Sequence, residues 1–364
     1  MNSFEAAIEN IIEQSGFKGC ERIKLMDDAS TRSYERLVKD GKTAILMKAP
    51  PENEIPPCPK DADVATRFEL GWNALSRLAA SRVEAFVAIA DFLQSKGFST
   101  PEIYAADCVN GVAVLEDLGN DLYAEILKGD GIANEEKLYT AAGELLAYLH
   151  ELDIPKILPA PNSEWPILDF DELALSVNAD LFVDWVPKYL GLEDYSQEVL
   201  ASWAEVRSAI IAKILNHPRA FTLRDYHAEN MLWLDGRDSI AKIGLLDFQD
   251  AVLGFRAWDF SMLLHDARRD VSKTAHEAAI KAYVAKTNIN EAALRHELDL
   301  EGSINILRII GIFSRLIKRD GKDKYRQFMP RMIGHLNAVL ENPELANLKN
   351  WIQKHAPLNE LQNV

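Results

Sequence analysis

One polar loop, followed by a short apolar stretch that ends in an acid, constrains the fold of this 364-residue chain. The segment 222–234 interrupts a helical pattern and carries Asp225 and Asn230, five positions apart. The apolar stretch 243–246 then leads directly into Asp247. A loop and the end of a neighbouring strand can bring such side chains together although they are distant in sequence. The pattern therefore predicts short β-strands inserted between helices, in a mixed α+β fold.

The residue types in this segment match the needs of phosphoryl transfer. One carboxylate must orient the attacking hydroxyl and accept its proton, while an amide oxygen and a second carboxylate must hold Mg²⁺ beside the phosphates. An Asp followed five residues later by an Asn is a weak signal alone, because both residue types also cap turns and helices. The strand that delivers Asp247 and the order of the upstream elements strengthen the prediction.

The first 119 residues are predicted to form a mostly antiparallel sheet with one major helix. Asp40-Gly41 and Asn110-Gly111 are strong turn signals between strand-like runs. A first helix is expected over 4–15, and the major helix is expected to end near Lys96-Gly97. The expected strands are 22–26, 34–38, 44–47, 102–106 and 112–116.

Beyond Gly119 the spacing of apolar residues becomes helical, apart from the segment described above. The chain is also longer than one small core usually requires, so two lobes or domains are expected. We place the boundary at this change in pattern. The predicted domains are an N-terminal lobe, residues 1–119, and a larger helical lobe, residues 120–364.

The charge of the chain narrows its partners. Forty Lys and Arg against 56 Asp and Glu give a net charge of −16, which disfavours duplex nucleic acid or an anionic membrane as a partner. ATP remains compatible, because a metal ion and a few cations can reverse the potential in one cleft. Three separated cysteines and an N-terminus without a signal pattern predict a cytoplasmic protein with no zinc site. We see no evidence of an obligate protein partner.

The strings around these residues resemble a known group of enzymes. Leu-Arg-Asp-x-His-x-x-Asn at 223–230, followed by Leu-Leu-Asp-Phe-Gln-Asp at 245–250, resembles the aminoglycoside phosphotransferase and choline kinase group. The longer strings 224–234 and 244–254 are similar to the bacterial cell-wall-recycling kinases that phosphorylate the anomeric hydroxyl of N-acetylmuramate and N-acetylglucosamine. Three further regions agree with this resemblance, namely 28–34, 115–119 and 311–322.

The resemblance implies a two-lobed, protein-kinase-like α+β fold, with a small antiparallel-sheet N-lobe and a larger, mostly helical C-lobe. It implies that Asp225 is the catalytic base and that Asn230 and Asp247 hold Mg²⁺. Arg224 is a second catalytic candidate, which either neutralises the transferring phosphoryl group or pairs with a carboxylate. The candidates for binding ATP are Ser30, Thr31 and Arg32 over the phosphates, Lys48, and the hinge residues Glu116 and Leu118.

The chain departs from the family pattern at several of these positions. Residues 28–34 contain no glycine, so a phosphate loop there would use hydroxyls and backbone N–H groups. Lys48 ends the third expected strand, where kinases keep a phosphate-binding lysine, but an acid is common there in the sugar kinases, so a surface role is equally open. His227 holds the loop or approaches the substrate, and Asp250 binds Mg²⁺ or supports its ligands.

We therefore expect an ATP- and Mg²⁺-dependent kinase that phosphorylates a small amino sugar in peptidoglycan recycling. One alternative is a kinase for another small alcohol, of the aminoglycoside, choline or homoserine type. Another is a nucleotide-binding regulator that has lost catalysis, although the intact Asp225, Asn230 and Asp247 argue against it. A protein kinase is disfavoured, because no Ala-Pro-Glu segment or activation loop lies between Asp250 and Asp259.

Overall fold

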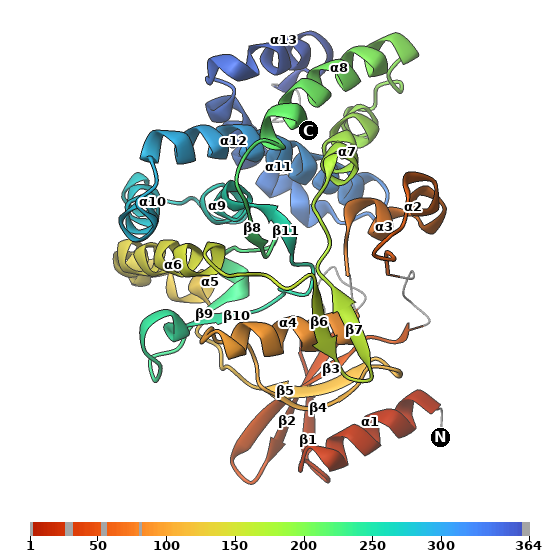
Figure 1. The fold of residues 1–364 in the computed structure, drawn as a ribbon, viewed down its shortest axis with the longest axis vertical. Helices are drawn as coiled ribbons and strands as arrows, with labels where there is room; N and C mark the ends of the chain where they lie inside the picture. The colour runs from red at the N-terminus through yellow and green to blue at the C-terminus, as the bar shows by residue number, and fades with distance from the viewer. Residues whose placement is uncertain (1–2, 26–31, 52–56, 80–81, 359–364) are drawn as a thin grey trace. The chain divides into compact units, whose positions relative to one another are not determined.

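The computed structural model describes residues 3–25, 32–51, 57–79 and 82–358 (Figure 1). Ser30 and Thr31 lie outside the described residues. The chain divides into two compact units. The first unit comprises Met1–Asn134, Asp153–Leu168 and Leu223–Val252, and the second comprises Glu135–Leu152, Asp169–Thr222 and Leu253–Val364. The polar segment around Asp225 and Asp247 thus belongs to the same unit as the N-terminal sheet. The lobe boundary at residue 119 stays a prediction.

The sheet of the first unit is antiparallel, with five strands in the order β1-β2-β3-β5-β4. Lys39 pairs with Lys42, so the β2–β3 connection has two residues, Asp40 and Gly41. Both have positive φ angles, 51° and 75°, as the tightest hairpin turns require. The predicted antiparallel sheet is confirmed. Its strands are β1 (Glu21–Lys24), β2 (Ser33–Lys39), β3 (Lys42–Lys48), β4 (Ile103–Asp107) and β5 (Val112–Glu116).

Alternation along the strands gives the sheet two different faces. One face packs against α1 (Ser3–Gln14), and its strand residues are Leu37, Ala44, Leu46, Val112 and Val114. The residues at the alternate positions, including Tyr34, Arg36 and Ile45, point to the other face. Phe86 of α4 (Val83–Ser95) also lies on that side. The first unit also contains α2 (Val64–Leu70), α3 (Trp72–Ser76), α5 (Tyr123–Ile126), β9 (Met231–Trp233), β10 (Ile243–Leu245), and an unpredicted hairpin, β6 (Ile157–Ala160) and β7 (Ser163–Pro166).

The second unit is mostly helical, as the sequence predicts. Several of its helices begin at a polar residue whose side chain accepts a hydrogen bond from the backbone, as Asp171, Ser196, Ser272 and Asn290 do. Its helices are α6 (Glu135–His150), α7 (Glu172–Leu190), α8 (Gln197–Ile214), α9 (Arg256–Leu264), α10 (Lys273–Thr287), α11 (Glu291–Lys318), α12 (Met329–Val339) and α13 (Ala346–His355). The short strands β8 (Arg219–Thr222) and β11 (Val252–Phe255) pair with each other.

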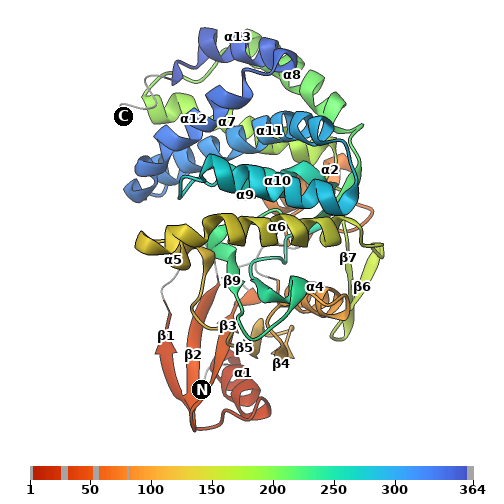
Figure 2. The same cartoon turned by 90° about the vertical axis from the view of Figure 1, so that its left-hand side faces the viewer.

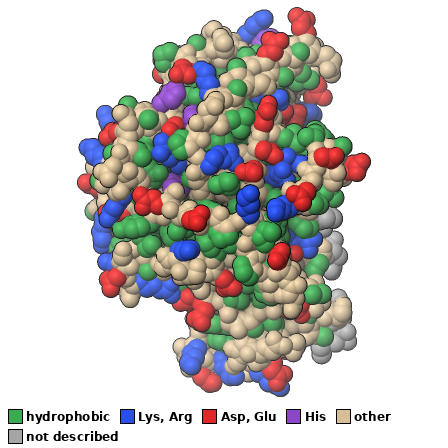
Figure 3. Space-filling model, viewed as in Figure 1, with side chains coloured by type: hydrophobic (Ala, Val, Ile, Leu, Met, Phe, Trp, Pro, Cys, Tyr) green, Lys and Arg blue, Asp and Glu red, His purple; other side chains and the backbone are tan. Residues whose placement is uncertain are grey.

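The distribution of charge and the polarity of the helices bear on the expected partners. On the face shown in Figure 3, acidic and basic side chains are interspersed, so the net charge of −16 is not gathered there in one acidic patch. Every helix in the described part of the chain is too short or too polar to cross a bilayer.

Close backbone approach between α6 and α10 generates a first prediction. These helices lie side by side (Figures 1 and 2), and a Cβ at Gly143 would lie 2.1 Å from the carbonyl oxygen of Ala279. Gly143→Ala should therefore lower the free energy of unfolding by about 1–3 kcal/mol. Gly334→Ala is the matched control, because a Cβ there meets nothing within 4 Å, and it should raise stability by about 0.5–1 kcal/mol. Urea unfolding midpoints that move in the same direction would contradict this account.

Candidate active site

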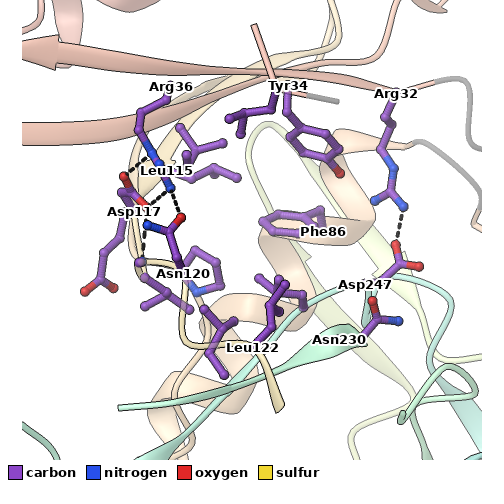
Figure 4. Close-up of a pocket in the computed structure, with 18 of the residues that line it drawn as sticks. Arg32, Tyr34, Arg36, Phe86, Leu115, Asp117, Asn120, Leu122, Asn230 and Asp247 are labelled. Atoms are coloured by element: carbon purple, nitrogen blue, oxygen red, sulfur yellow. Dashed lines mark hydrogen bonds and ion pairs between the residues drawn. The ribbon is translucent and has the colours of Figure 1, made fainter. Parts of the chain in front are cut away.

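A short backbone ladder brings Asn230 and Asp247 together. Strands β9 and β10 are antiparallel, and Met231 at the start of β9 pairs with Leu245 at the end of β10. The ladder continues one step further, because the Leu246 N–H donates to the Asn230 carbonyl at 2.9 Å. The residues just outside both strands must then be neighbours. Figure 4 shows the Asn230 carboxamide and the Asp247 carboxylate side by side at one end of a pocket.

The loop before β9 is held by its own polar groups. The Asp225 carbonyl accepts hydrogen bonds from the His227 N–H at 3.1 Å and from Asn230 Nδ2 at 2.9 Å. His227 is buried, and its Nδ1 accepts a hydrogen bond from the Glu229 N–H at 3.3 Å. These contacts hold the Asn230 side chain in one orientation and support a structural role for His227. Asp225 is half-buried within this loop.

The pocket is a cavity of about 460 Å³ that lies within the first unit. Its middle is largely apolar, with Phe86 and Leu115 among its walls. Figure 4 shows Arg32, Asn230 and Asp247 at one end and Arg36, Asp117 and Asn120 at the other. The cavity thus has a slot for a flat apolar group and a charged end suited to an ion or a polar tail.

The hinge segment predicted at 116–118 does line this pocket, through Glu116, Asp117 and Leu118. Glu116 is held by Arg237 at 2.6 Å. The Asp117 carboxylate is paired with Arg36 of β2 at 2.7 Å and accepts the Gly119 N–H at 3.1 Å. These bonds tie the segment to β2 and to Arg237, beside the cavity that it lines.

Arg32 meets Asp247 at the polar end of the pocket. The guanidinium is buried, and its Nη2 pairs with Asp247 Oδ1 while its Nη1 donates to Gln249 Oε1 at 2.7 Å. Burial alone would raise the pKa of Asp247, but the charge and hydrogen bond of Arg32, with a further bond from Gln249, lower it below the ordinary value. Asp247 is therefore ionised at neutral pH, as a metal ligand must be.

Two residues of the segment have strained backbones. Arg224 has φ 76° and Asp247 has φ 56°, in the left-handed region that side-chain-bearing residues seldom adopt. Such strain persists only where surrounding contacts impose it. Strained positions of this kind gather at functional sites, which supports a function for this segment.

The structure places Arg224 away from the pocket. Its side chain is 2% exposed, and Nη1 donates to the carbonyls of Ser76 and Arg77 at 2.9 and 3.1 Å, at the end of α3. The two roles considered from the sequence, phosphoryl contact and pairing with a carboxylate, stay predictions. Arg224 anchors the residue that precedes Asp225 to a neighbouring element.

Lys48 also lies away from the pocket. It shares a face of β3 with Ala44 and Leu46, which pack toward α1, and its ammonium pairs with Glu35 of β2. Burial alone would raise the pKa of Glu35, but hydrogen bonds from Arg22 and Lys48 lower it. Lys48 is thus tied to β2 on the face opposite the pocket, and its role in binding ATP stays a prediction. Arg32, on the pocket side, is the cation that stands beside Asp247.

Asp250 supports the segment rather than lining the cavity. Its Oδ1 accepts the Ala79 N–H at 2.6 Å, just beyond α3, and its Oδ2 is 3.4 Å from Gln249 Nε2. Phe248 stacks on Phe86 at 4.7 Å between ring centroids, which packs the turn after Asp247 against α4. The sequence analysis missed the pocket roles of Tyr34, Arg36, Phe86 and Asn120 and the bridging role of Gln249. Alternation along β2 could have placed Tyr34 and Arg36 on one face.

The fold is that of protein-kinase-like small-molecule phosphotransferases. A choline/ethanolamine kinase family protein from Mesorhizobium loti superposes with a TM-score of 0.57 at 17% identity, covering 99% of each chain. The gentamicin–APH(2'')-IIa complex superposes with a TM-score of 0.54 at 13% identity, covering 92% of this chain and 96% of the other. The predicted kinase-like α+β fold is confirmed.

Sequence comparison gives the family. The profile of the phosphotransferase enzyme family matches residues 22–296, and the chain belongs to this family. It is 44% identical over 97% of both chains to a protein of Caulobacter vibrioides named N-acetylmuramate/N-acetylglucosamine kinase. It is 30% identical to a Pseudomonas aeruginosa protein of the same name, over 90% of this chain and 86% of the other. The resemblance to the sugar kinases is confirmed.

The buried anchor of Arg224 generates a second prediction. Arg224→Met would leave two buried carbonyls without this donor, at roughly 1–3 kcal/mol for each. The free energy of unfolding should fall by about 3 kcal/mol. Arg237→Met removes a guanidinium whose side chain is 34% exposed, and should cost less than about 1 kcal/mol. Chemical unfolding of both variants measures the difference, and equal losses would show that Arg224 is not such an anchor.

Proposed function

We propose that this protein is an ATP-dependent kinase that transfers the γ-phosphoryl group to the anomeric hydroxyl of N-acetylmuramate or N-acetylglucosamine, giving the sugar 1-phosphate and ADP. The single observation that carries the reaction type is the Asp247 carboxylate beside the Asn230 carboxamide at the charged end of a pocket. The names and identities of the two relatives support the substrate. A role in peptidoglycan recycling follows from that substrate, and the cytoplasmic location stays a prediction.

The roles in this reaction divide between the two ends of the pocket. Membership of the family implies ATP as the phosphoryl donor. The adenine would lie in the apolar slot along Glu116 and Leu118, with the phosphates toward Arg32. Asp225 would orient the sugar hydroxyl and accept its proton, since its loop leads directly to Asn230.

The donor atoms present suit Mg²⁺. Asp247 offers a carboxylate and Asn230 an amide oxygen, because Asn230 Nδ2 is already directed at the Asp225 carbonyl. Mg²⁺ prefers such oxygen ligands and takes the rest from phosphates and water. Within the described residues, no group of three or more His, Cys, Asp or Glu side chains is arranged to hold a metal. When bound, the ion would neutralise charge that develops on the phosphates.

The substrate is tested by measuring ADP release from ATP and Mg²⁺ with each sugar. We expect turnover with N-acetylmuramate and N-acetylglucosamine well above the rate without a sugar. The same assay with an aminoglycoside, choline and homoserine tests the alternative acceptors. Turnover on one of those and on neither sugar would contradict the proposal. Stabilisation by ATP-Mg²⁺ without turnover on any acceptor would indicate a silent regulator.

Asp225→Asn tests the catalytic base. Loss of a positioned general base typically costs 10²- to 10⁴-fold in rate, so kcat should fall by about that factor. The Kd for ATP should stay within about twofold, because the proposed role has Asp225 act on the acceptor hydroxyl rather than on the nucleotide. Asp238→Asn, at an exposed position in the same unit, is the matched control. Unchanged kcat in Asp225→Asn would exclude the assigned role.

Asp247→Asn tests the metal site. The variant keeps the size of the side chain but removes the charge that attracts the ion, so the Mg²⁺ concentration for half-maximal turnover should rise at least about tenfold. The titration is made at saturating sugar, and chelation of all Mg²⁺ should abolish turnover of the unmodified protein. Superimposable Mg²⁺ titrations for the two proteins would place the metal elsewhere.

A further inference from the structure

One oxygen of the Asp247 carboxylate is already paired with a cationic side chain. Oδ1 of Asp247 is paired with Arg32 Nη2 (Figure 4). It also lies 3.1 Å from Gln249 Nε2. Both groups are donors, so this oxygen has its acceptor capacity engaged on two sides. A divalent ion bound to the other oxygen of the same carboxylate would lie close to the guanidinium and be repelled by it. The guanidinium and a divalent ion therefore compete for the charge of this carboxylate.

Gln249 holds the guanidinium in this place. Its Oε1 accepts from Arg32 Nη1 at 2.7 Å while its Nε2 faces Asp247, so one buried carboxamide bridges the two charged groups. Gln249 is in turn 3.4 Å from Asp250, which is bound to the Ala79 N–H. The Arg32 side chain is only 7% exposed. The Arg32–Asp247 ion pair is thus held in place by neighbouring hydrogen bonds, unlike a mobile ion pair on the surface.

We propose that the Arg32 guanidinium takes the place of the divalent metal beside Asp247 when no ligand is bound. Metal and nucleotide together then displace it from Asp247. This inference rests on the proposed function, which makes Asp247 a metal ligand. A guanidinium and a divalent cation repel each other and cannot share one oxygen, so Arg32 lowers the affinity of the empty pocket for free metal. Nucleotide phosphates offer the guanidinium a stronger, two-pronged acceptor. Its transfer to them frees the carboxylate for the ion.

Two consequences follow from this exchange. The partly buried carboxylate keeps a cationic partner in both states, which avoids the cost of leaving its charge unpaired. Metal and nucleotide should also strengthen each other's binding by the same factor, since coupling between two ligands is reciprocal. Arg32 would then be the residue that makes the metal enter with the nucleotide instead of before it.

The test uses the full chain without sugar and Mn²⁺ as the probe, followed by the loss of the free-ion signal in electron paramagnetic resonance. Without nucleotide, Arg32→Gln should bind Mn²⁺ at least about tenfold more tightly than the unmodified protein. The further gain in Mn²⁺ affinity caused by ADP should be smaller in Arg32→Gln than in the unmodified protein. Arg22→Gln removes the same charge on β1, outside the pocket, and should leave both quantities unchanged.

Further variants make the result decisive. Adding Asp247→Asn to Arg32→Gln should abolish the gained Mn²⁺ binding, which would locate it at this carboxylate. If Arg32→Gln does not fold, as judged by circular dichroism, Gln249→Ala loosens the same contact and should also raise Mn²⁺ affinity. Equal Mn²⁺ affinity in the variant and the unmodified protein, or a gain that survives Asp247→Asn, would overturn the inference. Failure of the proposed function would show separately, as absent sugar phosphorylation by the unmodified protein.

Discussion

The pairing of β9 with β10 is the constraint on which the site depends. Their three-residue ladder places Asn230 and Asp247 at the same end, although 16 residues separate them from one another in sequence. Hydrogen bonds between side chains would be a costlier way to bring the two residues together, because each side chain that is held in place loses rotamer entropy. The backbone ladder fixes their positions without that loss. Everything at the polar end of the pocket, including the contacts of Arg32 and Gln249, is arranged around that fixed pair.

The sheet contributes a second constraint, the separation of its faces. Neighbouring residues on β2 and β3 lie on opposite faces of the sheet. Leu37 and Leu46 fill the core beneath α1, while Arg36 and Ile45 line the pocket. A one-residue slip in register would exchange the two sets and expose the core. The two-residue turn at Asp40-Gly41 fixes the register and thereby protects the pocket.

Much of the fold and of the candidate site could be predicted from the sequence, because the signals lie in residues that are close together along the chain. Turn pairs and alternation predicted the strands, and apolar spacing predicted the helices. The order of Asp225, Asn230 and Asp247 predicted the chemistry. Contacts between distant segments could not be predicted in this way. Nothing local links Arg224 to the carbonyls of α3 or Arg32 to Gln249, since each contact depends on how separate elements pack.

Lys48 illustrates the difference between position along the chain and direction of the side chain. The resemblance to kinases drew attention to the end of the third strand, but alternation with Leu46 directs Lys48 to the α1 side. Lys48 therefore stands at the position along the chain where kinases keep a lysine, but its side chain lies on the face of the sheet away from the pocket. A cation that reaches the pocket comes instead from Arg32, just before β2 begins.

Both units are assembled from separate stretches of chain, and this interleaving bears on how the protein can be divided. A single cut between Leu152 and Asp153 would leave an N-terminal fragment and a C-terminal fragment that each carry pieces of both units. The core between the sheet and α1 would stay whole on the N-terminal fragment, because all of its residues precede the cut. The pocket would not, since its sheet wall and its Asn230–Asp247 end would then belong to different polypeptides.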